Sequence, residues 1–379
     1  MSSELPYDAI LFVSFGGPEG PDDVVPFMEN VTRGRGIPRE RLIEVSAHYS
    51  LFGGVSPLNA QNRELIAALG IELKLHGIDL PIYWGNRNWA PYLAEAVESM
   101  RADGVSRALA FVTSAFSSYS GCRQYRENIE EASSIVGEEA PVIDKIRVFY
   151  NHPGFVEPMI DNTLAAIAAI GARGVSRPEL AFTAHSIPMA SAVSSDYVVQ
   201  LRESCRIVAE AVSGHVGTAC PWELVFQSRS GTPGIPWLEP DICDHLRARY
   251  GEGTEGVVIV PIGFISDHME VVYDLDTQAK AVAEELGLPV ERAATVGVDP
   301  RFVAMVRALI EERIAVAAGI DPGRACVGTR PPNHDVCPLD CCPAPRRPPG
   351  GPSVPKTATR SDPGVPDPDG VPSGRGPVV

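Results

Sequence analysis

Basic residues are scarce in this chain. Its 32 lysines and arginines stand against 48 aspartates and glutamates, which gives a formal net charge of −16. A nucleic-acid-binding protein needs a basic face, so this balance argues against nucleic acid as a partner. It does not exclude a small anionic ligand, because a few local arginines are enough to bind one.

Long apolar runs are also missing. No stretch approaches the roughly 20 apolar residues of a membrane-spanning helix, and the N-terminal residues MSSELPYD lack the pattern of a signal peptide. We therefore expect no transmembrane segment and a cytoplasmic location. In such a reducing compartment, the eight cysteines indicate a metal or cluster site before they indicate disulfides.

Common nucleotide-binding and hydrolase motifs are missing after the predicted strands. Gly16-Gly17-Pro18 follows the first predicted strand, but neither GxGxxG nor GxxxxGK stands there, so a nucleotide-binding fingerprint is lacking. There is also no GxSxG elbow, which disfavours a Ser–His–Asp hydrolase with Ser186 or Ser14 as its nucleophile.

The chain does contain a regular alternation of strand and helix patterns. With 44% apolar and 21% charged residues, it has the composition of a soluble globular protein. The alternation predicts the α/β class, with two doubly wound parallel-sheet lobes. We expect an N-terminal lobe over residues 1–172, a C-terminal lobe over 173–325, a cysteine-rich segment over 326–342, and a disordered Pro/Gly-rich tail over 343–379.

Some element assignments matter for the site. The glycines and prolines of residues 33–59 predict a loop without a long regular element. Residues 146–150 and 293–296 are predicted strands, and a helix is expected to run from residue 267 to about 286.

Ionisable residues follow two of the predicted strands. His185 ends the strand at 179–184, while His268 and Glu270 follow the strand at 257–260, with Asp274 on the same helix face as Glu270. Carboxyl ends of parallel strands share one crevice, where imidazole and carboxylate can bind a metal or shuttle protons. The alternative is a strand-end histidine bonded to backbone, and acids at a helix N-terminus.

Cysteines crowd together after the last predicted helix, at Cys326, Cys337, Cys341 and Cys342. Four thiolates suit zinc or an iron–sulfur cluster, and spacing alone does not separate the two. Adjacent cysteines are awkward as joint ligands of one compact site, so we expect a further ligand from Cys122 at a strand end. The remaining cysteines are expected to be ordinary buried thiols: Cys205, Cys220 and Cys243.

Six segments, taken in order, carry a family resemblance: SFGGPEGPDDVVPFMENVTRGRGIP, HYSLFGGVSPLN, GNRNW, FTAHSIP, FQSRSGTPGIPWLEP and PIGFISDHMEVVYDLD. On these segments the chain resembles ferrochelatases over residues 7 to about 342. It is most similar to the actinobacterial coproporphyrin III ferrochelatases of the iron–sulfur-containing type.

The resemblance implies two Rossmann-like, chelatase-type lobes with a porphyrin cleft between them. It also implies a lyase that inserts Fe(2+) into coproporphyrin III to give coproheme in haem b biosynthesis, without nucleotide or redox chemistry. The alternatives are a protoporphyrin IX ferrochelatase, a chelatase for another divalent metal such as cobalt, and a tetrapyrrole-binding or cluster-sensor protein without insertion activity. Besides porphyrin and ferrous iron, transient contact with neighbouring haem-pathway enzymes is expected.

Site residues follow from the same resemblance. His185 and Glu270 are similar to the inner Fe(2+) pair, with His185 accepting pyrrole protons, and His268 and Asp274 would relay metal or protons. Phe15 stands where some bacterial members have a tyrosine metal ligand. Three residues match positions that contact the tetrapyrrole or line the cleft: Ser56, Tyr125 and Arg87.

For the cysteines, the resemblance implies a [2Fe–2S] cluster held by one internal and three C-terminal residues. Cys122, Cys326, Cys337 and Cys342 fit that pattern, with Cys341 as the competitor of Cys342 and structural zinc as the alternative to the cluster. Arg33, Arg35 and Arg123 are candidates for pairing with porphyrin propionates.

Overall fold

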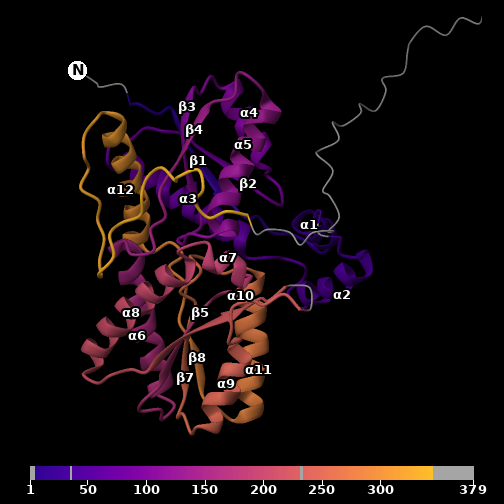
Figure 1. Cartoon of the computed structure of the whole chain (residues 1–379), viewed down its shortest axis with the longest axis vertical. Coiled ribbons are helices and arrows are strands. Elements are labelled where there is room, and N and C mark those ends of the chain that lie inside the picture. The colour runs from indigo at the N-terminus through magenta and orange to yellow at the C-terminus, as the bar shows by residue number, and fades with distance from the viewer. Residues whose placement is uncertain (1–4, 35, 231–233, 345–379) are drawn as a thin grey trace, which may run out of the picture.

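The computed structural model describes residues 5–34, 36–230 and 234–344, and in them the chain forms two α/β lobes, one above the other in Figure 1. Each lobe is built on four parallel strands, so the predicted fold class is confirmed. The predicted tail falls, from residue 345 onward, outside the described residues, and so does Arg35. The limits of the lobes at residues 172, 325 and 342 stay predictions.

The two sheets have the same strand order, in which the first strand of each half lies between the second and the third. All residues of β1 and β7 are buried, as expected of parallel strands with helices on both faces. The first sheet has the order β2 (Ile82–Asn86), β1 (Ala9–Ser14), β3 (Arg107–Val112), β4 (Val142–Lys145). The second has the order β6 (Trp222–Gln227), β5 (Glu179–His185), β7 (Val257–Val260), β8 (Val290–Arg292).

Helices cover both faces of the first sheet. On one face α4 (Leu93–Ala102) and α5 (Gln124–Val136) pack against alternate residues of β1 and β3. The other face packs on α3 (Leu58–Leu75), whose leucines repeat at helical spacing. A short π-helical turn, η2 (Tyr119–Arg123), leads from the end of β3 into α5.

Helices also cover both faces of the second sheet. One group of helices packs with the larger core and another group forms a separate cluster. The larger core holds α6 (Pro153–Gly171), α7 (Met189–Val193) and α8 (Tyr197–Val216). The separate cluster holds α9 (Ile242–Gly251), α10 (Met269–Tyr273), η3 (Asp274–Ala279) and α11 (Lys280–Leu286).

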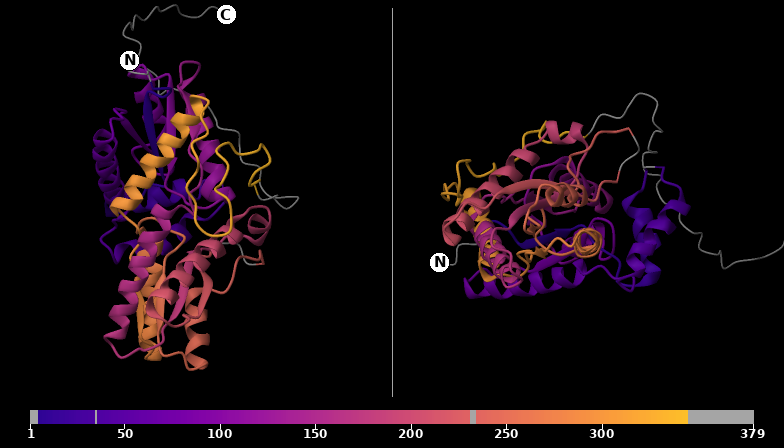
Figure 2. Two further views of the ribbon diagram at one scale, coloured as in Figure 1. Left: turned by 90° about the vertical axis from the view of Figure 1, so that its left-hand side faces the viewer. Right: turned by 90° about the horizontal axis from the view of Figure 1, so that it is seen from below.

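The last helix, α12 (Pro300–Ala317), joins the two lobes. It leaves the second lobe and packs against α6 and α3, so that it lies along the first lobe in Figures 1 and 2. Phe302 of α12 contacts Phe149 with ring centres 5.9 Å apart, and Phe149 is 5.9 Å from Phe155 of α6. One hydrophobic core therefore runs from the first sheet into the second.

The prediction of a loop over residues 33–59 is wrong, because α2 (Arg39–Ser50) lies within it. The turn-forming residues stand outside this helix: Pro38 precedes it, and Gly53 and Gly54 follow it with φ of +66° and +76°. The twelve residues of the helix contain neither glycine nor proline. α2 packs on α1 (Val24–Val31), which follows the 3₁₀ turn η1 (Pro21–Asp23).

Two predicted strands are displaced. The strand expected at residues 146–150 is β4, at Val142–Lys145, and the one expected at 293–296 is β8, at Val290–Arg292. In both cases the more apolar residues lie just past the strand and are buried against the core. The apolar run in the sequence therefore indicated a strand a few residues too late. The helix expected from residue 267 begins at Met269 and is interrupted by the π-helical turn η3.

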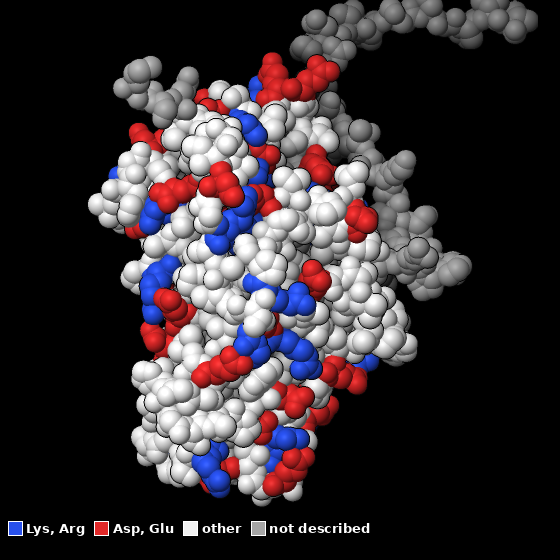
Figure 3. Space-filling view, turned by 60° about the vertical axis from the view of Figure 1, so that its left-hand side comes forward, with Lys and Arg blue, Asp and Glu red and all other residues white. Residues whose placement is uncertain are grey.

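On the face shown in Figure 3, acidic and basic side chains are interspersed and no large basic area is formed. None of the helices in the described residues is both long and apolar enough to cross a membrane.

Candidate active site

His185 is the last residue of β5 and is held from two sides. Its Nδ1 lies 2.5 Å from the carbonyl oxygen of Ser186, and its own carbonyl accepts a hydrogen bond from Tyr197, at 3.0 Å. Since a carbonyl oxygen can only accept, Nδ1 carries the proton and the neutral ring presents its lone pair at Nε2. The side chain is 32% exposed, so Nε2 is available as a base or a ligand.

Glu270, in the first turn of α10, faces that nitrogen. One carboxylate oxygen lies 3.5 Å from His185 Nε2, and the side chain is 48% exposed. His268 is the N-cap of α10: its Nδ1 accepts a hydrogen bond of 3.2 Å from the backbone N–H of Glu270. The structure thus brings His185, His268 and Glu270 together, and it gives His268 a part in orienting Glu270.

Asp274 lies one turn further along, at the C-terminal end of α10. Its carboxylate accepts hydrogen bonds from the Ser228 hydroxyl and, at 3.5 Å, from the Gln227 amide. Gln227 also donates to the backbone oxygen of Glu270, at 3.1 Å. Gln227 ends β6 beside His185 and Ser228 directly follows it, and sequence reasoning missed both as site residues. The strand-end argument applied to His185 would also have found Gln227, because β6 ends at Gln227, directly beside the end of β5.

The surroundings shift the pKa values of these groups in different directions. Burial acts to lower the pKa of His185, but the charge and hydrogen bond of Glu270 outweigh it, and the pKa is raised. Burial lowers the pKa of His268, and the attraction of Glu270 does not fully offset it. Burial raises the pKa of Asp274 to about 7, against the opposing hydrogen bond from Ser228. The buried Asp274 is therefore an acid suited to exchange protons near neutral pH, beside two histidines whose pKa values are shifted in opposite directions.

Two other acids of this stretch have a structural role. Arg292 forms ion pairs with Asp267 at 3.2 Å and with Asp276 at 2.7 Å. The backbone N–H of Asp267 donates to Gln61 of α3, at 2.9 Å. These contacts attach the start of α10 to the first lobe and to the β8 edge, and they leave Glu270 and Asp274 as the acids directed at His185.

The facing edge of the first sheet carries Arg87, Phe15 and Tyr125. The Arg87 guanidinium lies 5.9 Å from the centre of the Phe15 ring and 5.6 Å from that of Tyr125. Burial raises the pKa of Tyr125 to about 12, so its hydroxyl stays protonated. Ser56 is only 4% exposed, and a Cβ on Gly17 would lie 2.7 Å from the Ser56 Cβ. Ser56 therefore lies packed beneath the first-strand turn.

Aromatic contacts connect this edge to the acids of the second lobe. Phe27 lies 6.2 Å from Phe15 and 6.2 Å from Tyr49 of α2. The pKa of Tyr49 is raised by burial and by the charges of Glu270 and Asp274, which places its hydroxyl near both. The neighbouring His48 stacks on Tyr273 of α10, with ring centres 4.1 Å apart. The helix that the sequence analysis missed thus connects the two lobes at the site.

Four cysteines line one small cavity beside η2 and β4. Its walls consist of four thiols and three basic side chains: Cys122, Cys337, Cys341, Cys342, Arg123, Arg126 and Lys145. A hydrogen bond from Cys337, together with Lys145 and Arg126, lowers the pKa of Cys122. The structure therefore gathers three of the predicted cluster cysteines and adds Cys341. Cys326 is exposed and is not among the residues lining this cavity.

Of the cysteines expected to be ordinary thiols, Cys205 and Cys220 are buried and Cys243 is half-buried. Burial raises the pKa of Cys243 to about 11. Arg123, a candidate for propionate binding, instead pairs with Glu127 at 2.9 Å and donates to the carbonyl oxygens of Leu339 and Cys341.

Comparison with known proteins gives consistent results. The model of the family described as Ferrochelatase matches residues 7–314. A Streptomyces coelicolor protein named coproporphyrin III ferrochelatase is 56% identical over 352 residues, 89% of this chain and 94% of its own. A Rhodopirellula baltica protein named ferrochelatase is 54% identical, covering 92% and 97%. The sirohydrochlorin chelatase SirB of Bacillus subtilis subspecies spizizenii, solved with cobalt, has a TM-score of 0.47 at 11% identity, covering 83% and 97%.

Proposed function

This chain belongs to the ferrochelatase family, and we propose that it inserts Fe(2+) into coproporphyrin III to give coproheme in haem b biosynthesis. The observation that supports this most is the pairing of His185 and Glu270, 3.5 Å apart, at the edge of one sheet that faces the aromatic edge of the other. The name of the Streptomyces coelicolor relative supports the choice of porphyrin.

In the proposed mechanism, the site removes two pyrrole protons while ferrous iron enters the ring. The lone pair of His185 Nε2 accepts the first proton, and the adjacent Glu270 carboxylate stabilises the imidazolium that forms. Before it accepts that proton, the Nε2 lone pair can join the Glu270 carboxylate in offering a nitrogen and an oxygen donor to the incoming Fe(2+), a set that suits this ion. Once the first proton has passed to Asp274, Nε2 accepts the second. Asp274, whose pKa of about 7 lets it exchange protons readily, passes protons away from the pair, with His268 fixing the helix start.

The porphyrin is proposed to contact the first lobe. Arg87, held between Phe15 and Tyr125, presents a flat cationic surface to the macrocycle or its propionates. Ser56 fixes the turn beneath that surface, since its hydroxyl accepts a hydrogen bond of 3.4 Å from Leu58. Phe15 offers no oxygen ligand, so the iron would have no protein ligand at that position.

We further propose that the cysteines hold a [2Fe–2S] cluster, with structural zinc as the alternative. The donor set fits an anionic group held by thiolates, because Lys145 and Arg126 line the same cavity and stabilise the ionised form of Cys122. A bound metal group would cross-link the C-terminal segment to the start of α5. The cytoplasmic location and the transient contacts with neighbouring haem-pathway enzymes stay predictions of the sequence.

The test is an anaerobic insertion assay on the purified full chain with Fe(2+) and coproporphyrin III. We expect turnover in the wild type and in the control His215→Ala, whose side chain is exposed at the end of α8. We expect at least a 10²-fold loss in His185→Ala, the range for removing a general base. Tight porphyrin binding without turnover in the wild type would instead favour a tetrapyrrole carrier or sensor.

A further inference from the structure

The helix that carries Glu270 is too short to fix its own position. α10 has five residues and passes directly into the π-helical turn η3. Helices shorter than roughly 12 residues are marginal in water by themselves, so the place of such a helix depends on the contacts that other elements make with it. The direction of the Glu270 carboxylate is therefore set by whatever holds the two ends of α10.

The start of α10 is held by both lobes at Asp267, the residue before the His268 N-cap. The second lobe binds its side chain: Arg292 donates to both carboxylate oxygens, at 3.2 Å each, and the Thr295 hydroxyl donates to one of them at 3.3 Å. The first lobe binds its backbone, because the N–H of Asp267 donates to the side-chain oxygen of Gln61 in α3, at 2.9 Å. An amide oxygen of the opposite lobe thus fixes the chain one residue before the N-cap.

The end of α10 is held by α2 of the first lobe. Tyr273 is the last residue of α10, and its ring stacks on that of His48, with the ring centres 4.1 Å apart and the planes 13° from parallel. Both side chains are half-buried. α2 is itself fixed to the first lobe, because Leu42 packs in one small core with α1 and Trp89. The first lobe therefore contacts α10 at both ends.

Glu270 lies midway between these two contacts, three residues from Asp267 and three from Tyr273. Its backbone is bound to the second lobe through the Gln227 amide, at 3.1 Å, but its side chain is 48% exposed and faces His185 Nε2 at 3.5 Å. A small rotation or shift of α10 would change that distance. Misplacing a reacting group by about 1 Å can cost about 10²-fold in rate.

We propose that Gln61 and His48 are positioning residues, which hold α10 at its two ends so that the Glu270 carboxylate faces His185. The part of that pair in metal insertion rests on the proposed function, whereas the holding of α10 rests on the two contacts. Both residues belong to the lobe that is proposed to contact the porphyrin, so the geometry of the pair depends on the lobe opposite to it. Since they act on the helix and not on the macrocycle, their loss lowers kcat more than it changes KM.

The experiment measures anaerobic insertion of Fe(2+) into coproporphyrin III by the full-length wild type and by paired variants. Gln61→Met removes the hydrogen-bond acceptor at similar volume, whereas Gln61→Glu keeps an oxygen there. His48→Ala removes the stacked ring, whereas His48→Phe keeps a flat ring. We expect kcat to fall about tenfold in Gln61→Met and His48→Ala and to return to within about twofold of the wild type in Gln61→Glu and His48→Phe. KM for coproporphyrin III should stay within about twofold throughout.

Hydrogen–deuterium exchange of the backbone at residues 266–274 gives a second measurement, which needs no turnover. We expect exchange there to be at least about threefold faster in Gln61→Met and His48→Ala, and to match the wild type in Gln61→Glu and His48→Phe. Glu64→Met changes an exposed residue of α3 and is the control, with wild-type kcat and wild-type exchange.

Wild-type kcat or wild-type exchange at residues 266–274 in Gln61→Met or His48→Ala would overturn the proposal. So would a rise in KM at constant kcat, because it would assign the two residues to porphyrin binding, and so would a kcat that Gln61→Glu and His48→Phe do not restore. If the wild type itself inserts no iron, the proposed function fails. The exchange at residues 266–274 then decides by itself whether Gln61 and His48 hold α10.

Discussion

Nε2 of His185 and a carboxylate oxygen of Glu270 lie 3.5 Å apart, although 84 residues separate them in the sequence. Two structural features create this pair. The parallel register of β5 and β7 brings both strand ends to one edge, and the His268 N-cap fixes the helix start that carries Glu270. The proposed proton chemistry depends on this contact.

Replacing Glu270 tests the electrostatic part of the pair. Glu270→Gln removes a charge that raises the pKa of His185, so the pKa falls and the neutral base persists to lower pH. We expect kcat/KM to drop by about 10²-fold and the acidic limb of the remaining activity to move to lower pH. The measurement is a pH–rate profile, with the exposed Glu252→Gln as the control. If the acidic limb of the pH–rate profile does not move in Glu270→Gln, the charge of Glu270 does not control the pKa of His185.

Asp274 provides a second pH test, on stability. Its pKa is raised to about 7 by burial, above its unfolded value of 3.8, so its contribution to stability is complete at low pH and is lost as pH rises through 7. The wild type should lose about 2 kcal/mol through this group between pH 5.5 and 8.5, whereas Asp274→Asn should not. Denaturant unfolding at both pH values measures this, and the exposed Asp244→Asn should behave as the wild type.

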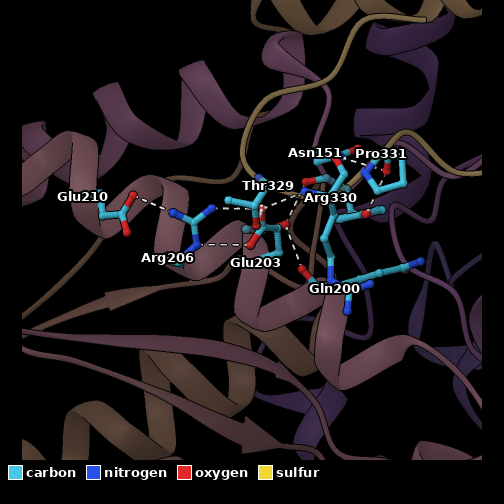
Figure 4. Close-up of polar contacts among 10 residues, drawn as sticks. Asn151, Gln200, Glu203, Arg206, Glu210, Thr329, Arg330 and Pro331 are labelled. Carbon is cyan, nitrogen blue, oxygen red and sulfur yellow. Dashed lines mark hydrogen bonds and ion pairs between the residues drawn. The ribbon is translucent and has the colours of Figure 1, made fainter.

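The anchor of the cysteine-rich segment can be weakened at Glu203 of α8, which accepts a hydrogen bond from the backbone N–H of Thr329 (Figure 4). Hydrogen bonds from Arg206 and Thr329 overcome the effect of burial and lower the pKa of Glu203 to about 2. Glu203→Ala removes the acceptor of the hydrogen bonds from the half-buried Arg206 and the exposed Thr329, and should cost about 1–2 kcal/mol at pH 7. Limited proteolysis should then cut within residues 318–344 faster. Glu210→Ala removes the 64% exposed partner of the same arginine and should change stability by less than about 1 kcal/mol.

Arg87 tests the porphyrin wall. Arg87→Ala removes the cationic side chain that is proposed to contact the porphyrin. Losing about 1.4 kcal/mol of uniform substrate binding should raise KM for coproporphyrin III about tenfold while kcat changes less. Steady-state kinetics with Arg177→Ala as an exposed control measure this. A fall in kcat at constant KM would place Arg87 in the proton or metal step instead.

The sequence predicted that His185 and Glu270 of the second lobe would meet. Sites in open α/β sheets lie at the carboxyl ends of the strands, so only the strands had to be recognised in the sequence. β7 is a continuous apolar run and β5 is mostly apolar, so both strands could be recognised and His185 and Glu270 placed on one edge. Gln227 and Ser228 were missed, although β6 ends at the same edge. Ser228 adopts a φ of +62°, a conformation that no sequence pattern signals for serine.

Other features depend on long-range packing. α2 has a weakly amphipathic sequence between glycines and prolines, and what stabilises it is contact with α1 and the stacking of His48 on Tyr273. The grouping of Cys122 with residues more than 200 positions later follows from the return of α12 to the first lobe. Spacing alone could not show that Cys341 lies in the cavity and that Cys326 does not.

The most direct test of the proposed function is steady-state kinetics of the purified chain with Fe(2+) and either coproporphyrin III or protoporphyrin IX, under identical anaerobic conditions. The account predicts turnover of coproporphyrin III with a kcat/KM at least tenfold above that for protoporphyrin IX. Equal or preferred use of protoporphyrin IX would contradict the substrate, and absence of turnover with both would contradict the enzyme.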